Sequence, residues 1–278
     1  MIFLLSITYN IESGSMRIVD FKKKIFDDTI SIVSDSFLIT GLRGIQDENT
    51  IKIMENVFAT SGSTTLLCDS VIFYSNTGRL RLFDNIVIIK ENFLFSGNNG
   101  DYFINEDSGF VMKKFFLKTD SSLIKGNYAT FNKERIKIFE SPSYERENLL
   151  ISSDTIIYKF NDSTAIFLQN VRIKTKEIKG LCGKLFYNDR MNDGYFYDNP
   201  VILTEKDSIV CDSGYFDFKK NESLSFRTFI FSRLDDGSNK VSGNLARFFF
   251  SSNKLDSLFI FNDTKGEFAK YDSLNKKP

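Results

Sequence analysis

The feature that most constrains this chain is a repeat of about 29 residues. Seven segments share a small residue, then Asp, Asn or Gly, and then an aromatic residue four positions further on. We call the Asp, Asn or Gly of each segment its anchor; successive anchors lie 29, 29, 27, 29, 29 and 32 residues apart. A fixed period of this length is typical of folds made by stacking one small unit. The anchors are Asp69, Asn98, Asn127, Asp154, Gly183, Asp212 and Asn244, and Gly41 begins a fainter eighth copy.

The second half of each unit repeats as well. Asn85, Asn170 and Asn199 each follow an anchor by 16 residues, and an apolar stretch follows each of them. The chain has 30 Phe and 11 Tyr but only 3 Pro and no Trp, and aromatic residues favour the pleated surface of a sheet. Turn-rich stretches such as 161–164 and 192–194 separate the halves and fit hairpins between antiparallel strands. We therefore predict two antiparallel strands per unit.

The apolar positions of each unit change parity at the anchor. Apolar residues such as Leu66 and Phe95 stand three positions before it, whereas Val71 and Phe73 stand two and four positions after it. Alternate residues of a strand share a face, so a change of parity requires one extra residue. Because Asp, Asn and Gly accept the left-handed backbone that such a bulge needs, we predict that the anchors are the corners of each unit.

The three cysteines take the small position immediately before an anchor. Cys68, Cys182 and Cys211 replace the Gly or Ser of other units, and their wide spacing fits neither a disulfide framework nor a zinc pair. We therefore predict that they are packing residues.

Composition argues against several classes of function. The absence of histidine removes the commonest general base and metal ligand, and we expect no enzyme, metal or cofactor. The 36 basic and 36 acidic residues cancel, so nucleic acid is not an expected partner. The anchor aspartates could resemble a calcium or catalytic ladder, but Gly and Asn fill the same position, which favours a role in the turn.

The expected domain organisation follows the limits of the repeat. Residues 1–37 form an N-terminal segment, whose first seven residues resemble a weak or truncated export signal and which ends in a leading strand at 30–33. No linker interrupts residues 38–271, which we predict to be one repetitive β domain. Residues 272–278 form a short tail.

The corners and the strands that follow them resemble those of a known family. Leu67–Tyr74 combines Cys-Asp with a following aromatic residue, and Phe83–Ile88 contains Asp-Asn-Ile before an apolar strand. In these motifs, and over residues 34–271, the chain resembles the OstA-like (organic solvent tolerance) family of periplasmic lipopolysaccharide-transport proteins. The resemblance implies an elongated, open, V-shaped antiparallel β-jellyroll, here built from about eight units of two strands, in the periplasm of a Gram-negative bacterium.

The resemblance also implies a ligand and partners. Acyl chains of lipid A would lie in the apolar interior, and exposed edge strands would pair with other lipopolysaccharide-transport proteins or head-to-tail with further copies. The parity of the repeat then predicts which side chains line the groove. They are Val71, Phe73, Ile88, Tyr102, Leu117, Phe131, Tyr158, Ile173, Tyr187, Phe216, Phe231 and Phe248.

Two other functions remain open at the level of sequence. A structural or adhesive β-solenoid would have the same repeat around a closed, packed core. A carbohydrate-active β-helix would carry acidic and basic residues clustered on one outer face. Neither the openness of the interior nor the identity of the lipid follows from the residues alone.

Overall fold

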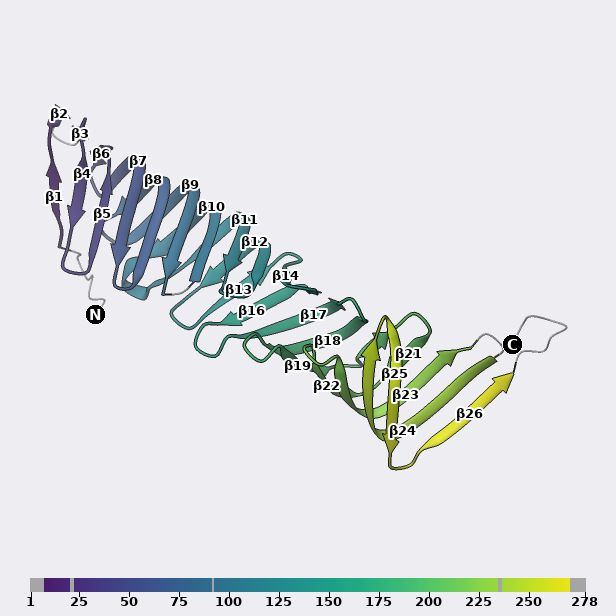
Figure 1. The fold of residues 1–278 in the computed structure, drawn as a ribbon. Helices are drawn as coiled ribbons and strands as arrows, with labels where there is room; N and C mark the ends of the chain where they lie inside the picture. The colour runs from purple at the N-terminus through teal and green to yellow at the C-terminus, as the bar shows by residue number, and fades with distance from the viewer. Residues whose placement is uncertain (1–7, 21–22, 92, 235–236, 271–278) are drawn as a thin grey trace. The chain divides into compact units, whose positions relative to one another are not determined.

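The computed structural model describes residues 8–20, 23–91, 93–234 and 237–270, and the chain divides into two compact units, residues 1–140 and 141–278. The first seven residues, predicted as part of an export signal, and the tail 272–278 lie outside the described residues. Apart from one short 3-10 helix, every regular element is a β-strand (Figure 1). The described residues include no helix long and apolar enough to cross a membrane.

The described residues of the first unit form thirteen strands and the 3-10 helix η1. They are β1 (Asn10–Ser13), β2 (Met16–Asp20), β3 (Lys23–Phe26), β4 (Ile30–Val33), β5 (Phe37–Gly41), β6 (Arg43–Asp47), β7 (Thr50–Ser61), β8 (Thr64–Tyr74), β9 (Arg79–Lys90), β10 (Phe93–Phe103), η1 (Ile104–Glu106), β11 (Ser108–Lys118), β12 (Leu123–Phe131) and β13 (Arg135–Phe139).

The part of the second unit that the structure describes forms thirteen further strands. They are β14 (Ser143–Arg146), β15 (Leu149–Ser152), β16 (Thr155–Lys159), β17 (Thr164–Lys174), β18 (Lys179–Asn188), β19 (Asp193–Tyr197), β20 (Val201–Leu203), β21 (Asp207–Val210), β22 (Ser213–Asp217), β23 (Glu222–Arg233), β24 (Gly237–Ser251), β25 (Lys254–Phe261) and β26 (Lys265–Lys270).

Strand pairing arranges each unit in two layers. The first half of the long strand β7 pairs with β6, and its second half pairs with β5. In the second unit β23 divides in the same way between β22 and β21. A long strand therefore starts in one layer, turns a corner and ends in the other. We call the layer containing β6, β16, β19, β22 and β25 layer 1, and the layer containing β5, β15, β20, β21 and β26 layer 2. All these pairings are antiparallel, so the predicted antiparallel β-jellyroll is confirmed.

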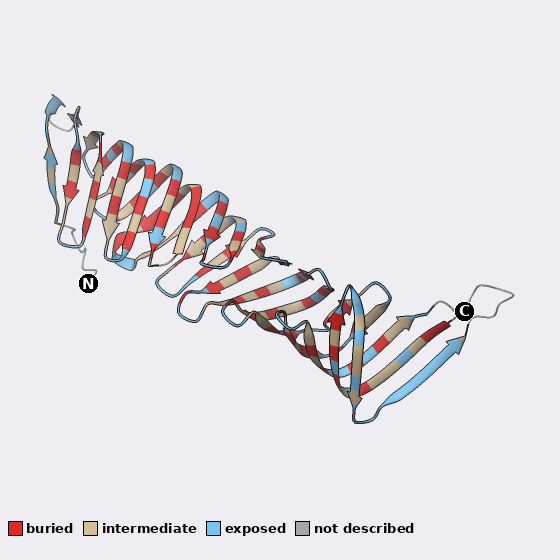
Figure 2. Cartoon of the chain, in the orientation of Figure 1, coloured by how far each residue is buried: buried red, intermediate tan, exposed pale blue. Residues whose placement is uncertain are grey.

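Burial follows the predicted parity. Along β8 the side chains of Leu66, Cys68, Val71 and Phe73 are buried, and the alternation changes phase at Asp69. Figure 2 shows the same alternation of buried and exposed residues along many other strands. The inward side chains of the two layers form the core of each unit.

The corners lie at the anchors, but the left-handed residues do not. The structure describes all seven anchors, and none of them has a positive φ. The residues with left-handed backbone lie instead in the neighbouring strand, as a dipeptide such as Asp84 (φ 55°) with Asn85 (φ 48°). This dipeptide lies opposite the single anchor Asp69, between the pairs Leu67 with Val87 and Ser70 with Phe83. The bulge therefore lies on the strand that faces the anchor and not at the anchor itself, so the prediction that placed it at the anchor was wrong.

The anchor residues are explained by what they contact across the corner. The carboxylates of Asp69 and Asp154 accept hydrogen bonds from the side-chain amides of Asn85 (2.8 Å) and Asn170 (2.7 Å). At Gly183 an added Cβ would lie 2.6 Å from Cβ of Asp198, so a side chain from the bulge fills the place of the anchor's own. Short polar residues or glycine are therefore required at the anchor by this contact, although its backbone is extended.

A small residue is required immediately before the anchor, because the two layers converge there. A Cβ at Gly97 would clash with Cγ1 of Val111, and one at Gly243 would clash with Cγ2 of Ile260. The three cysteines occupy this position in their units as free, buried thiols, which confirms the prediction that they are packing residues.

Candidate functional site

The candidate site is the apolar interior between the two layers. Of the twelve residues predicted to line it, eleven are buried, with side chains at most 4% exposed. The inward aromatic residues four positions after the anchors all belong to layer 1, and all seven are buried. They are Phe73, Tyr102, Phe131, Tyr158, Tyr187, Phe216 and Phe248. Each 29-residue repeat therefore places one aromatic ring on the inner face of layer 1 in its own compact unit.

Phe231 is the exception. It is only partly buried, whereas its neighbours Thr228 and Ile230 are 2% and 1% exposed. Phe226 pairs with Leu245 and Thr228 with Gly243, so Arg227 faces the anchor Asn244 of β24 one to one and β23 lacks the extra bulge residue. Without that residue the inward positions fall one place earlier, and Ile230 takes the place predicted for Phe231.

The two layers touch through aromatic rings. Phe37 of layer 2 lies 5.4 Å from Phe73 of layer 1, measured between ring centroids, and Phe95 lies 5.1 Å from Phe131. In the second unit Tyr144 of layer 2 packs edge-on against Tyr187 of layer 1 at 5.2 Å. Such pairs add to the free energy of burial. The chain's own side chains therefore fill the interior at these levels.

The edge of each unit opposite the corners is formed by the hairpin turns of both layers, and we call it the mouth. Because strands run from a turn to the corner and back to a turn, turns of layer 1 such as 189–192 face turns of layer 2 such as 175–178. Asn253, in the turn between β24 and β25, donates its backbone N–H to the carboxylate of Glu177 at 2.8 Å. Glu205 donates its N–H to the carbonyl of Asn253 at 3.1 Å. Polar bonds thus cross the mouth between the layers.

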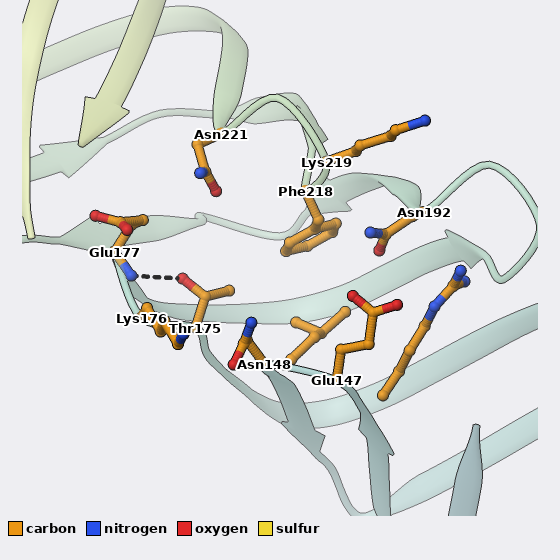
Figure 3. A pocket seen from close by; sticks show the side chains of 11 residues that line it. Glu147, Asn148, Thr175, Lys176, Glu177, Asn192, Phe218, Lys219 and Asn221 are labelled. Carbon is orange, nitrogen blue, oxygen red and sulfur yellow. Dashed lines mark hydrogen bonds between the residues drawn. The ribbon is translucent and has the colours of Figure 1, made fainter. Parts of the chain in front are cut away.

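A polar hollow of about 310 Å³ lies at the mouth of the second unit. Figure 3 shows Phe218 and Asn192 from layer 1 facing Glu147 and Asn148 from layer 2. Arg146, Lys176 and Lys219 contribute positive charge to its lining, and Glu147 and Glu177 contribute negative charge. This place was not predicted from the sequence, because the lining residues lie in turns of separate repeats.

An aspartate stands at the mouth of each compact unit, half-buried in the first and buried in the second. Asp107 follows η1 in the first unit, and Asp189 follows β18 in the second. The hydroxyl of Tyr102 donates to Oδ1 of Asp107 at 3.0 Å, and that of Tyr158 to Oδ2 of Asp189 at 3.2 Å. Burial and the nearby Asp107 raise the pKa of Tyr102 to about 12, so its hydroxyl stays protonated and donates.

The anchor aspartates have local structural partners. Besides the amide bonds of Asp69 and Asp154, Asp212 pairs with Arg227 at 3.2 Å on the exposed side of the corner. No group of three or more possible metal ligands occurs among the residues that the structure describes.

Part of the chain is similar to known proteins. Residues 98–231 match the family model described as OstA-like protein, so the resemblance seen in the sequence is confirmed for this segment. A solved structure with partial similarity is LptH, described as the LptA homologous periplasmic component of the conserved lipopolysaccharide transport device from Pseudomonas aeruginosa. The identity is 12%, the TM-score is 0.36, and the match covers 38% of this chain and 82% of LptH. A search of curated proteins finds no match.

Proposed function

We propose that this chain is a periplasmic lipopolysaccharide-transport protein that carries the acyl chains of lipid A between its two layers. The OstA-like match over residues 98–231 carries this proposal, because it falls on units whose inward residues are aromatic and aliphatic. An acyl chain needs no directed bond and is held by any dry apolar surface. The inward faces of layers 1 and 2 supply such a surface.

The mouth suits the polar part of the same ligand. The hollow in the second compact unit combines the cations Lys176, Lys219 and Arg146, the last of which is paired with Asp189, with the amides of Asn148 and Asn221 and the carboxylates of Glu147 and Glu177. Cations and amides recognise phosphate and sugar hydroxyl groups. A lipid whose tails lie between the layers would place its head group at this edge.

The outermost strands suit partners that add strands. Among the described residues β1 pairs only with β4 and β2 only with β3, while β25 and β26 both pair only with β24. Ile18 of β2 is 60% exposed and Phe268 of β26 is 59% exposed. Unpaired edges with apolar side chains favour strand addition. We propose that these edges bind other lipopolysaccharide-transport proteins or further copies of the chain, head to tail.

Competition for bound lipopolysaccharide tests the proposal. The full chain is loaded with fluorescently labelled lipopolysaccharide and challenged with intact, fully deacylated or core-sugar material. Intact lipopolysaccharide should displace the label, whereas deacylated material should fail even at a hundredfold excess. Equal displacement by deacylated material would refute binding through the acyl chains.

One observation favours a second candidate, a structural β-solenoid with a packed core. The ring contacts of Tyr144 with Tyr187 and of Phe95 with Phe131 already fill the space between the layers. A purely structural protein would bind neither intact nor deacylated lipopolysaccharide, so the same experiment separates the two functions.

A further inference from the structure

In the first unit one carboxylate joins the layers across the mouth. Asp107 lies in a turn of layer 1, whereas Thr64 and Lys90 are the mouth-side residues of layer 2 in β8 and β9. The Lys90 ammonium lies 2.5 Å from Oδ2 of Asp107, and the Thr64 hydroxyl donates to Oδ1 at 3.1 Å. Lys90 is only 4% exposed, which is rare for a lysine. Its charge is therefore held inside by this carboxylate.

The second unit has the same arrangement with different residues. Asp189, in a turn of layer 1, accepts a 2.6 Å hydrogen bond from the hydroxyl of Tyr144 in layer 2. Nη1 of Arg146, also in layer 2, donates to Oδ1 of Asp189 at 3.0 Å and to its backbone carbonyl. Asp189 is 3% exposed. The two compact units thus each place one aspartate of layer 1 in contact with layer 2 at the mouth, although the donors in layer 2 are different residues.

Two other contacts of aspartate side chains stay within one layer. Asp101 of β10 binds Arg79 of β9 at 2.6 Å, and Tyr215 of β22 donates to Asp193 of β19 at 2.9 Å. Both pairs join neighbouring strands of layer 1. They have the chemistry of the Asp107 and Asp189 contacts, but their loss would not separate the layers.

We propose that Asp107 and Asp189 are latches that hold the mouth of each unit closed and control access to the interior. This inference rests on the proposed function, since it names the step that must precede entry of an acyl chain. The interior residues are buried by contact between the layers, so a ligand reaches them only when the turns separate. The latches are the buried charged contacts that such a movement must break, and breaking one leaves a charge without its partner.

Uptake of Nile red, an apolar dye, tests the latches independently of lipopolysaccharide. The full chain is mixed with the dye, and the rate of fluorescence increase is followed. The double variant Asp107→Asn/Asp189→Asn should take up dye about tenfold faster than the wild type, because the ionic part of each latch is lost. The matched double variant Asp101→Asn/Asp193→Asn should stay within about twofold of the wild type, because no bond across the mouth is lost.

A second variant covers the case in which the first does not fold. Lys90→Met/Tyr144→Phe removes one cross-layer donor from each latch while Asp107 and Asp189 keep their other donors, and it should also accelerate uptake. Folded latch variants that take up dye at the wild-type rate would contradict the proposal that Asp107 and Asp189 hold the mouth closed. An equal acceleration in the control variant Asp101→Asn/Asp193→Asn would contradict it as well. If dye uptake accelerates but lipopolysaccharide does not bind, the latches stand and the proposed function fails.

Discussion

The hydroxyl of Tyr144 lies 2.6 Å from the carboxylate of Asp189, although the two residues are 45 positions apart and belong to opposite layers. Burial, together with the nearby Tyr187 and Asp189, raises the pKa of Tyr144 well above its ordinary value, so it stays a donor at any physiological pH. Tyr158 and Arg146 are further partners of this carboxylate. One side chain is therefore bonded to both layers.

Replacing Asp189 should destabilise the chain more than replacing a similar residue within one layer. Asp189→Ala leaves Arg146 without its carboxylate and should cost about 3 kcal/mol or more. Asp193→Ala removes only the acceptor of Tyr215 and should cost about 1 kcal/mol. Urea unfolding followed by circular dichroism measures both. Equal losses would show that Asp189 contributes no more than an ordinary hydrogen bond.

The bulges predict a stabilising substitution. Lys113 (φ 62°) and Lys114 (φ 54°) hold the left-handed conformation that Asp84 and Asn85 hold elsewhere. A side chain with a Cβ costs about 1 kcal/mol in that conformation, which glycine avoids. Lys114→Gly should therefore raise the free energy of unfolding by up to about 1 kcal/mol.

An ordinary strand lysine provides the control for this substitution. Lys118 is exposed at the end of β11 and is absent from the residues with positive φ. Lys118→Gly should lower stability, because glycine is entropically unfavourable in a strand. The same direction of change at both positions in urea unfolding would contradict the role assigned to the bulge.

The cysteines should be unreactive in the folded chain. Burial raises the pKa of Cys68 and Cys182 to about 12 and that of Cys211 to about 11. The thiolate is the reactive form, so a disulfide reagent at pH 8 should react slowly with the native chain and rapidly in urea. Fast labelling of the native chain would show that the corners open.

The same shifts predict how stability depends on pH. The folded chain holds these protons more tightly than the unfolded chain, whose thiols titrate near the ordinary value of 9.0. Their contribution is therefore fully present below pH 9 and is lost as the pH rises toward 12. Cys68→Ser should reduce this alkaline loss, as measured by urea unfolding between pH 8 and 11. An unchanged slope would contradict the burial of the thiol.

Much of the fold could be predicted from the sequence because parity in a strand is a local property. The phase change between Cys68 and Val71 identified both inward faces before any contact was known. The position of the bulge could not be predicted in this way, since Asp69 and Asn85 both tolerate left-handed backbone and only strand pairing distinguishes them. Phe231 was misplaced for a related reason, because nothing local shows that β23 lacks the extra residue.

The mouth could not be predicted from the repeat. Asp107 and Asp189 lie 9 and 6 residues after their anchors, so they occupy no common position. Their partners Thr64 and Tyr144 are 43 and 45 residues away in the sequence. Such contacts follow from the bending of each strand around a corner, which brings the ends of different repeats together.

Site-specific photo-crosslinking to lipopolysaccharide tests the central claim most directly. A photoreactive residue is placed at the inward positions Phe73 and Phe216, both 0% exposed, and at the outward positions Leu67 and Phe226, which are 39% and 46% exposed. Each unit thus supplies one inward position and one outward control. The interior should capture lipopolysaccharide at Phe73 and Phe216 and much less at Leu67 and Phe226. Equal capture at inward and outward positions, or capture only outside, would contradict transport between the layers.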